Sequence, residues 1–275
     1  METRFIEINQ SQIYFEQSGS GTPLIFIHGA FADSSMWDPQ WEYFQDRFQV
    51  IRYDLRGHGK TGPSGLDTYQ METFVDDLAA LMDFLDISSA IFCGVSFGGS
   101  IAQGFASRYP EKVKGLVLAG SMVSMSLTFS EKIQRYVLVP KWLMSGIIKS
   151  MSVKQFVEFS YFLSRIFFGK NFLSYDEKVS EYLRNCMVTI DSQEYLKIWQ
   201  AIYGFNSFPL ERITSPTLVL NGEKEPKRII NHSKELIKRI PLTQWEIIAQ
   251  AKHSMNMENA KEFNRILDEF IRFLS

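Results

Sequence analysis

One short segment of the chain places a serine where it could act as a nucleophile. The apolar run Ile91-Phe92-Cys93, typical of a buried strand, leads into Gly94-Val95-Ser96-Phe97-Gly98 and then into a helical pattern. A Gly-x-Ser-x-Gly turn between a strand and a helix holds its serine in a strained conformation and projects the hydroxyl outward. The helix would also direct free N–H groups toward negative charge beside Ser96. Small residues also surround serines in ordinary turns, so this segment alone leaves both interpretations open.

A serine nucleophile at neutral pH needs a general base, usually a histidine that a carboxylate orients. Three of the four histidines lie in less suitable places, because His28 directly follows an apolar strand, His58 lies in a glycine-rich turn and His232 falls in a polar helical stretch. The fourth, His253, lies in the loop after the last predicted strand. Loops at the carboxyl ends of parallel strands gather at one sheet edge, so we expect His253 to meet Ser96.

The carboxylate that orients the histidine is expected after the preceding strand, in Asn221-Gly222-Glu223-Lys224-Glu225-Pro226. Glu225 is favoured because it lies three residues past Gly222 in the loop, ahead of a helix. Glu223, which follows the turn immediately, remains the alternative. The other usual position, after the run that ends at Ala119, carries no acidic residue.

Acyl transfer also requires N–H donors for the oxyanion that forms. The backbone N–H of Phe97 is one candidate, and the N–H of Ala30, in His28-Gly29-Ala30-Phe31, is the other. For His28 itself, a hydrogen bond that braces this loop is favoured over a catalytic role. The same structural role is expected for three polar residues around the tight turn at Gly57 and Gly59: Asp54, Arg56 and His58.

The elements that must position these residues form an alternating pattern. Short apolar, β-branched runs with helical patterns between them predict a mostly parallel sheet covered by helices, an α/β fold. The runs are Leu24–Ile27, Val50–Tyr53, Ala90–Cys93, Gly115–Ala119, Thr217–Leu220 and Gln244–Ile248. A hairpin of residues 5–9 and 12–17 is expected at the sheet edge, and a terminal helix over residues 260–274. In the helix predicted from Thr68 to Asp86, we expect Asp76, Asp77 and Asp83 to face water.

The alternation stops between residues 121 and 208. This stretch is rich in Met, Phe, Leu and Tyr at helical spacing and contains no good strand candidate. We therefore expect an inserted all-helical cap over 121–208, with residues 1–120 and 209–275 forming the core. The cap helices are predicted at 132–138, 142–151, 153–168, 176–188 and 192–203. Most of the aromatic residues should pack a core, but some should contact substrate above Ser96.

Composition limits the partners and the compartment. The 275 residues carry a net charge of −2, which gives no electrostatic reason to expect nucleic acid or a membrane and suits a small-molecule substrate. Two cysteines, Cys93 and Cys186, are too few for a disulfide framework or a zinc cluster, so no metal or cofactor is expected. The first nine residues alternate like a strand and lack the apolar core of a signal peptide, which favours the cytoplasm. No feature predicts an oligomeric state.

Taken together, the quoted motifs resemble those of the alpha/beta-hydrolase superfamily over essentially the whole chain. The resemblance implies a nucleophile, acid and histidine in that order, which correspond to Ser96, Glu225 and His253. Two departures are visible: most relatives carry aspartate where Glu225 stands, and many carry glycine at the position of Lys252. The acid loop is similar to that of acyl-homoserine-lactone lactonases with a glutamate acid.

The function expected from these residues is a cofactor-independent serine hydrolase that cleaves an ester or lactone of a small, largely apolar substrate through an acyl-enzyme. Within the family the same site serves carbon–carbon bond hydrolases, amidases or iminopeptidases, and perhydrolases, so these alternatives stay open. A ligand receptor with slow turnover, built on a hydrolase scaffold, is a further alternative. Dehalogenation and epoxide opening are disfavoured, since those relatives carry aspartate where Ser96 stands.

Overall fold

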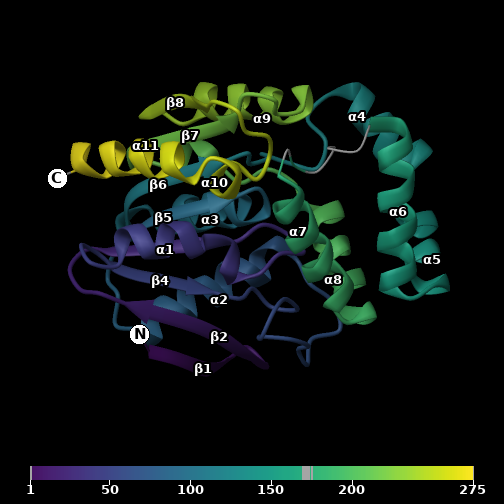
Figure 1. Ribbon diagram of the computed structural model, residues 1–275, viewed down its shortest axis with the longest axis horizontal. Helices are drawn as coiled ribbons and strands as arrows, with labels where there is room; N and C mark the ends of the chain where they lie inside the picture. The colour runs from purple at the N-terminus through teal and green to yellow at the C-terminus, as the bar shows by residue number, and fades with distance from the viewer. Residues whose placement is uncertain (1, 169–173, 175, 275) are drawn as a thin grey trace.

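The computed structural model describes residues 2–168, 174 and 176–274 (Figure 1). Its centre is an eight-stranded sheet in the order β1-β2-β4-β3-β5-β6-β7-β8. The neighbouring pairs β1/β2 and β2/β4 are antiparallel, and the other pairs are parallel. The strands are β1 (Glu2–Ile8), β2 (Ser11–Ser18), β3 (Pro23–Ile27), β4 (Gln49–Tyr53), β5 (Ala90–Val95), β6 (Val113–Ala119), β7 (Thr217–Gly222) and β8 (Thr243–Ile248). Each apolar run that predicted a strand is confirmed.

The edge hairpin also forms where the sequence predicts it. β1 and β2 are joined through Asn9 and Gln10, whose φ angles of 46° and 63° are both positive. A two-residue turn with two positive φ angles has the twist that antiparallel strands need, which explains the tight pairing of Ile8 with Ser11.

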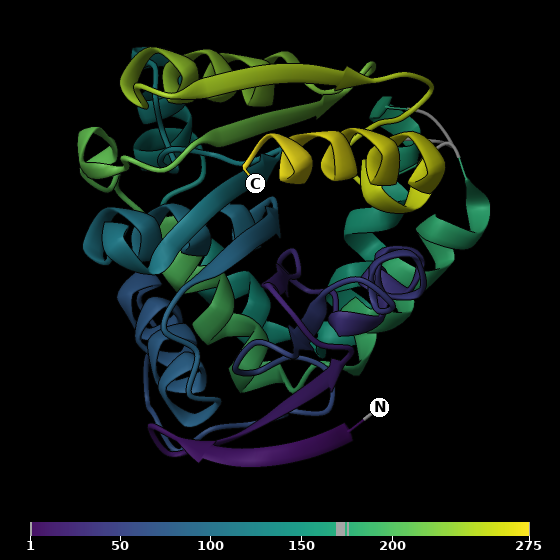
Figure 2. The ribbon, with the colours of Figure 1, turned by 90° about the vertical axis from the view of Figure 1, so that its left-hand side faces the viewer.

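Helices cover both faces of the sheet, as Figure 2 shows most clearly. Side chains alternate along each strand, so Leu24 and Phe26 of β3 face one helical layer while Ile25 and Ile27 face the other. The first layer contains η1 (Ser34–Trp37), α1 (Asp38–Phe44), α10 (Met255–Glu258) and α11 (Ala260–Phe273). The second contains α2 (Met71–Phe84), α3 (Phe97–Arg108) and α9 (Lys227–Arg239), with the short η2 (Pro110–Lys112) and η4 (Leu210–Arg212) in its connections.

One prediction about α2 is wrong. Asp76 and Asp83 face solvent and pair with basic side chains, but Asp77 is buried. Its carboxylate accepts hydrogen bonds of 2.9 and 2.6 Å from the Nε and Nη2 atoms of Arg56, which is itself fully buried. A buried charge persists only when it is paired, and the partner comes from a loop 21 residues earlier in the chain, which helical periodicity does not reveal.

Between β6 and β7 the described residues form helices and no strand. These are α4 (Phe129–Ile133), the π-helix η3 (Gln134–Leu138), α5 (Lys141–Ser150), α6 (Val153–Phe168), α7 (Glu177–Thr189) and α8 (Ser192–Gly204). They lie together at one end of the molecule (Figure 1). The division of the chain at 120/121 and 208/209 stays a prediction, and residues 169–173 and 175 of the predicted cap lie outside the described residues.

Candidate active site

Ser96 occupies a strained turn between β5 and α3. Its φ of 53° and ψ of −114° form a conformation that a residue with a side chain rarely adopts, at a cost of about 1–3 kcal/mol. The Ser96 N–H donates to the carbonyl of Ala119 at 2.7 Å, which anchors the turn to β6. A Cβ atom on Gly98 would overlap the backbone oxygens of Ile27 and His28, so only glycine lets α3 begin this close to β3.

The loops after β7 and β8 bring a carboxylate onto a histidine. His253 Nδ1 lies 2.6 Å from Glu225 Oε1, and the Glu225 side chain is fully buried. The other oxygen, Oε2, accepts from the N–H of Gly222 at 3.3 Å. Burial alone would lower the pKa of His253, but the hydrogen bond and negative charge of Glu225, with the charge of Glu258, raise it above the ordinary value. The carboxylate thus orients the imidazole and stabilises its protonated form.

Glu223, the alternative acid, points elsewhere. Its Oε2 accepts from the N–H of Gln250 at 3.0 Å, and its Oε1 pairs with Lys224 at 3.2 Å. Both partners are near the surface, and the Glu223 side chain is 45% exposed. The geometry therefore joins Glu225, and not Glu223, to His253.

Ser96 and His253 line the same cavity, whose volume is about 340 Å³. Among the hydrogen bonds of the described residues, none joins the Ser96 hydroxyl to the imidazole. The His253 side chain is 36% exposed, so the ring face away from Glu225 is open to this space. The core and helix α7 supply an apolar lining that includes Ala30, Met36, Val95, Leu183, Met187 and Ile229.

Ala30 and Phe97 provide backbone donors beside this space. Phe97 is the first residue of α3, where an N–H has no partner within the helix. Ala30 lines the cavity with Ser96, and Gly29 approaches the serine so closely that a Cβ there would lie 3.7 Å from Ser96 Cβ. Within the described residues, neither of these two N–H groups donates a hydrogen bond.

The polar residues expected to brace the loops do so. His28 Nδ1 donates to the Gly29 carbonyl at 2.7 Å, and its Nε2 accepts from the N–H of Leu55 at 2.9 Å. The Asp54 carboxylate accepts from the N–H groups of Ser34 and Lys60, both at 2.7 Å. These bonds link the loop after β3 to the loop after β4, so both ring nitrogens of His28 are occupied.

His58 adds a second buried imidazole to this region. Its Nδ1 lies 2.8 Å from the Arg56 carbonyl, while its Nε2 has no hydrogen-bond partner in the described part of the chain. Burial and the neighbouring His28 lower the pKa of His58 to about 3. Burial likewise lowers the pKa of His28, despite the charge of Asp54. Both rings are neutral at neutral pH.

Sequence reasoning missed a contact between α7 and the loop after β3. The Tyr182 hydroxyl donates to Asp33 Oδ1 at 2.8 Å and accepts from the Asp33 N–H at 3.4 Å. Leu183 and Met187, on the same helix, line the cavity. Their spacing of four residues places them on one face of α7, a signal present in the sequence, but the partner of Tyr182 lies 149 residues away.

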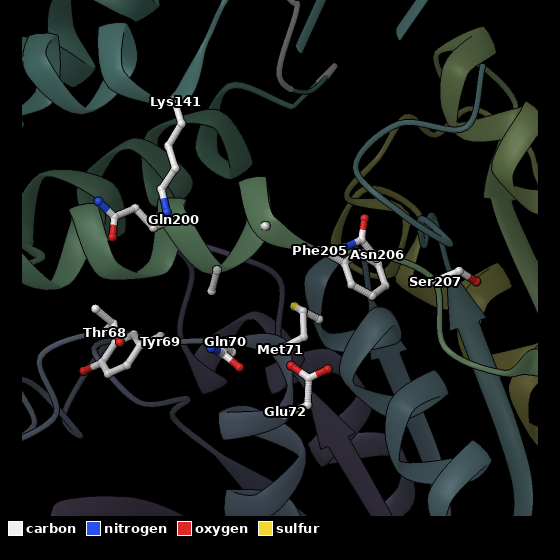
Figure 3. Close-up of a pocket in the computed structure, with 12 residues that line it drawn as sticks. Thr68, Tyr69, Gln70, Met71, Glu72, Lys141, Gln200, Phe205, Asn206 and Ser207 are labelled. Carbon is white, nitrogen blue, oxygen red and sulfur yellow. The ribbon is translucent and has the colours of Figure 1, made fainter. Parts of the chain in front are cut away.

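A second, larger hollow lies elsewhere. Figure 3 shows this space of about 490 Å³ between the start of α2 and helix α8, with the side chain of Lys141 extending toward Gln200. Its lining is mostly polar and includes none of Ser96, Glu225 and His253. This hollow is larger than the cavity at Ser96, but only the smaller cavity joins a strained serine to an oriented base. We therefore assign the candidate active site to the smaller cavity.

The described residues contain neither a metal-binding cluster nor a membrane-spanning helix. No group of three or more His, Cys, Asp and Glu side chains among them is arranged to hold a metal ion. None of the described helices has both the length and the apolar character needed to cross a bilayer.

Comparison with known proteins defines the class. A family model described as alpha/beta hydrolase fold matches residues 22–260, and the chain belongs to this family. It is similar to 3-oxoadipate enol-lactonase 2 of Acinetobacter baylyi, at 26% identity over 90% of this chain and 88% of the relative. The solved enol-lactonase of Burkholderia xenovorans has a TM-score of 0.81 at 22% identity, covering 98% of this chain and 99% of the other. A solved N-acyl homoserine lactone degrading enzyme has a TM-score of 0.73 at 22% identity, covering 97% and 99%.

These relatives, together with the family, support a hydrolase. The solved structures share less than 25% identity with this chain, so they establish its fold alone.

Proposed function

We propose that the protein is a serine hydrolase that cleaves an ester or lactone of a small, largely apolar substrate. The hydrogen bond of 2.6 Å between His253 and a fully buried Glu225, beside a strained Ser96 in a shared cavity, carries this proposal. The enol-lactonase relatives are consistent with it. The proposed reaction requires no cofactor.

The chemistry follows from the positions of five groups. In the first step His253 Nε2 takes the hydroxyl proton while Ser96 Oγ attacks the carbonyl carbon. This step requires rotation about the Cα–Cβ bond of Ser96 to bring Oγ within hydrogen-bond distance of the imidazole. The N–H groups of Ala30 and Phe97 stabilise the oxyanion. His253 then gives its proton to the leaving alcohol, which departs as an acyl-enzyme forms. A water molecule, deprotonated by His253, releases the acid and restores Ser96, while Glu225 holds the imidazole throughout.

The lining of the cavity limits the substrate class. A substrate with a carboxylate next to the scissile bond would need a cationic partner in so apolar a space, because burying an unpaired charge is costly. The twelve described residues that line the cavity include no lysine or arginine. We therefore propose a neutral substrate, which differs in this respect from the 3-oxoadipate enol-lactone named for the relatives.

Replacement of the nucleophile tests the proposal. Ser96→Ala should reduce the turnover of p-nitrophenyl butyrate by at least about 10³-fold and abolish labelling by a fluorophosphonate probe. Ser88→Ala, at an exposed serine just before β5, is the matched control and should keep both activities. A folded Ser96→Ala protein that hydrolyses the ester at the parental rate would show that another group performs the reaction.

A further inference from the structure

The helical insertion carries an apolar surface that the proposed hydrolysis does not use. Seventeen large hydrophobic side chains are exposed in the described residues, and ten of them fall within residues 129–168. We call these ten the cap outer face: Phe129, Ile133, Tyr136, Val137, Leu138, Trp142, Leu143, Phe159, Phe162 and Ile166. Exposed apolar surfaces of this extent mark sites that contact something other than water.

Helix α6 is apolar on two sides. Val153 and Val157 are buried toward the rest of the protein, whereas Phe159, Phe162 and Ile166 follow one another at spacings of three and four and are exposed. This spacing places the three on one stripe of the helix. The inner side chains account for the packing of α6, so the exposed stripe is not needed to hold the helix in place.

The other described helices of this region also carry exposed apolar side chains. Helix α5 packs on α8 and on α6, and α6 packs on α7. Trp142, near the start of α5, is 75% exposed. In Figure 1, α5 and α6 form the end of the molecule opposite the C-terminus, where an extended flat partner can reach them without meeting the core.

The charge of this region is opposite to that of the whole chain. Residues 129–168 contain six basic and two acidic residues, a net charge of +4 in a chain whose total is −2. The region has four exposed lysines, and no ion pair or hydrogen bond of the described residues engages their ammonium groups: Lys132, Lys141, Lys149 and Lys154. Lys141 and Lys149 line two hollows between α5, α8 and the loop before α2, whereas Lys132 and Lys154 lie outside both hollows.

Both acidic residues of the region are already engaged. Glu158 receives hydrogen bonds from Arg184, and Glu131 caps the start of α4 while it also faces Arg228. The surface therefore presents aromatic and aliphatic side chains together with unpaired positive charge. This combination is typical of protein surfaces that lie in the headgroup region of anionic bilayers.

We propose that the cap outer face binds the surface of an anionic lipid membrane, with its aromatic side chains inserted among the headgroups. A second copy of the chain is a poorer occupant, because a symmetric contact would bring the same unpaired lysines together. The net charge of the whole chain conceals this local excess, which is why composition alone argues against a membrane. The proposal does not depend on the hydrolase reaction.

Vesicle sedimentation tests the proposal with the full chain. The protein should sediment with phosphatidylcholine vesicles that contain phosphatidylglycerol, more at low salt than at high salt, and much less with phosphatidylcholine alone. The double variant Lys132→Gln, Lys154→Gln should lower the partition coefficient for the anionic vesicles by about thirtyfold. The control Lys234→Gln, Lys238→Gln, on exposed lysines of α9, should leave it unchanged.

A second pair of variants tests insertion. Trp142→Ser with Phe162→Ser should weaken binding by at least about tenfold. Phe273→Ser, at an exposed aromatic of α11, is the matched control. Brominated lipids should quench tryptophan fluorescence in the parent protein and much less in Trp142→Phe, which keeps an aromatic side chain. Turnover of a soluble ester, measured alongside, should be the same in all of these variants and shows that they are folded.

The outcomes separate clearly. Absence of binding to anionic vesicles, or binding that the lysine and aromatic variants do not change, overturns the proposal. Sedimentation equilibrium that shows a dimer dissociated by Trp142→Ser would assign the surface to a second copy and also overturn it. Loss of ester turnover in Ser96→Ala with unchanged vesicle binding would leave the membrane proposal standing independently of the catalytic one.

Discussion

Histidines at the same edge of the sheet lie in opposite electrical environments. After β8, His253 has a carboxylate on Nδ1, an open cavity at the rest of the ring and a raised pKa. After β3 and β4, His28 and His58 bond only to backbone groups and have lowered pKa values. Position at the edge is therefore not sufficient: a base needs one nitrogen fixed by a charge and the other free.

Removal of the imidazole of His253 should give the largest effect on catalysis. His253→Ala should lower kcat for p-nitrophenyl butyrate by about 10⁴- to 10⁶-fold, because nothing else in the cavity can accept the serine proton. Its melting temperature should fall less than that of His28→Ala, since the His253 ring is partly exposed and Glu225 keeps the N–H of Gly222 as a donor. Steady-state kinetics and thermal unfolding on the same preparation measure both. A His253→Ala protein that retains activity would break the distinction between the loops.

The acid on Nδ1 is the next test. Glu225→Gln should lower kcat/KM by about 10⁴-fold, because an amide no longer selects the tautomer that leaves Nε2 free. In the parent, kcat/KM should rise with pH through a pKa above 6.5, since only the neutral imidazole accepts a proton. Without the carboxylate charge the pKa of His253 falls. The rise of kcat/KM with pH should therefore occur at a lower pH in Glu225→Gln than in the parent.

The exposed neighbour supplies the control for that experiment. Glu223→Gln removes a carboxylate of the same type from the same loop, two residues away, and should leave the rate and the pH profile unchanged. If Glu223→Gln instead shifted the profile, the assignment of the orienting acid would be wrong.

His28 should show the opposite balance of effects. His28→Ala would leave the Gly29 carbonyl and the Leu55 N–H without their partners, at about 1–3 kcal/mol for each buried group. The free energy of unfolding should therefore fall by about 2–5 kcal/mol, measured by urea denaturation at neutral pH. A loss as small as that of His253→Ala would show that the loop does not depend on this bridge.

The sequence alone predicted the residues of the candidate site but not all of their long-range contacts. Strand-to-loop position and the Gly-x-Ser-x-Gly turn are local signals, so Ser96, His253 and the two candidate acids could be found from the chain alone. The choice between those acids needed the contact with His253, and the burial of Asp77 needed Arg56 from a distant loop. Long-range polar pairs leave no periodic trace in the chain, which is why both were beyond sequence reasoning.

The pH dependence of stability sharpens the comparison further. The pKa of His58 is about 3 in the folded chain and near 6.5 when unfolded, so its contribution to stability is present above pH 6.5 and is lost as pH falls toward 3. His58→Asn can keep the bond to the Arg56 carbonyl but does not titrate. Between pH 7 and pH 5 this variant should lose about 2 kcal/mol less unfolding free energy than the parent.

His253 provides the opposite sign in that measurement. Its folded pKa is raised, so it adds stability that is fully present below pH 6.5 and disappears as pH rises through the folded pKa. His253→Ala should therefore make the loss of stability on acidification steeper than in the parent. Equal slopes in His58→Asn, His253→Ala and the parent would contradict the assignment of opposite environments.

The contact between Tyr182 and Asp33 connects the insertion to the loop that follows His28, and its loss should have the smallest effect. Tyr182→Phe keeps the ring but removes the hydrogen bond of 2.8 Å to the carboxylate. Leu183 and Met187 lie on the same helix and line the cavity, so a looser α7 weakens substrate binding without disturbing the groups that transfer protons. KM should rise about two- to tenfold with kcat nearly unchanged. Tyr43→Phe, at an exposed tyrosine of α1, is the control. A fall in kcat at constant KM would instead place Tyr182 among the groups that act on the transition state, because uniform loss of binding cannot produce that pattern.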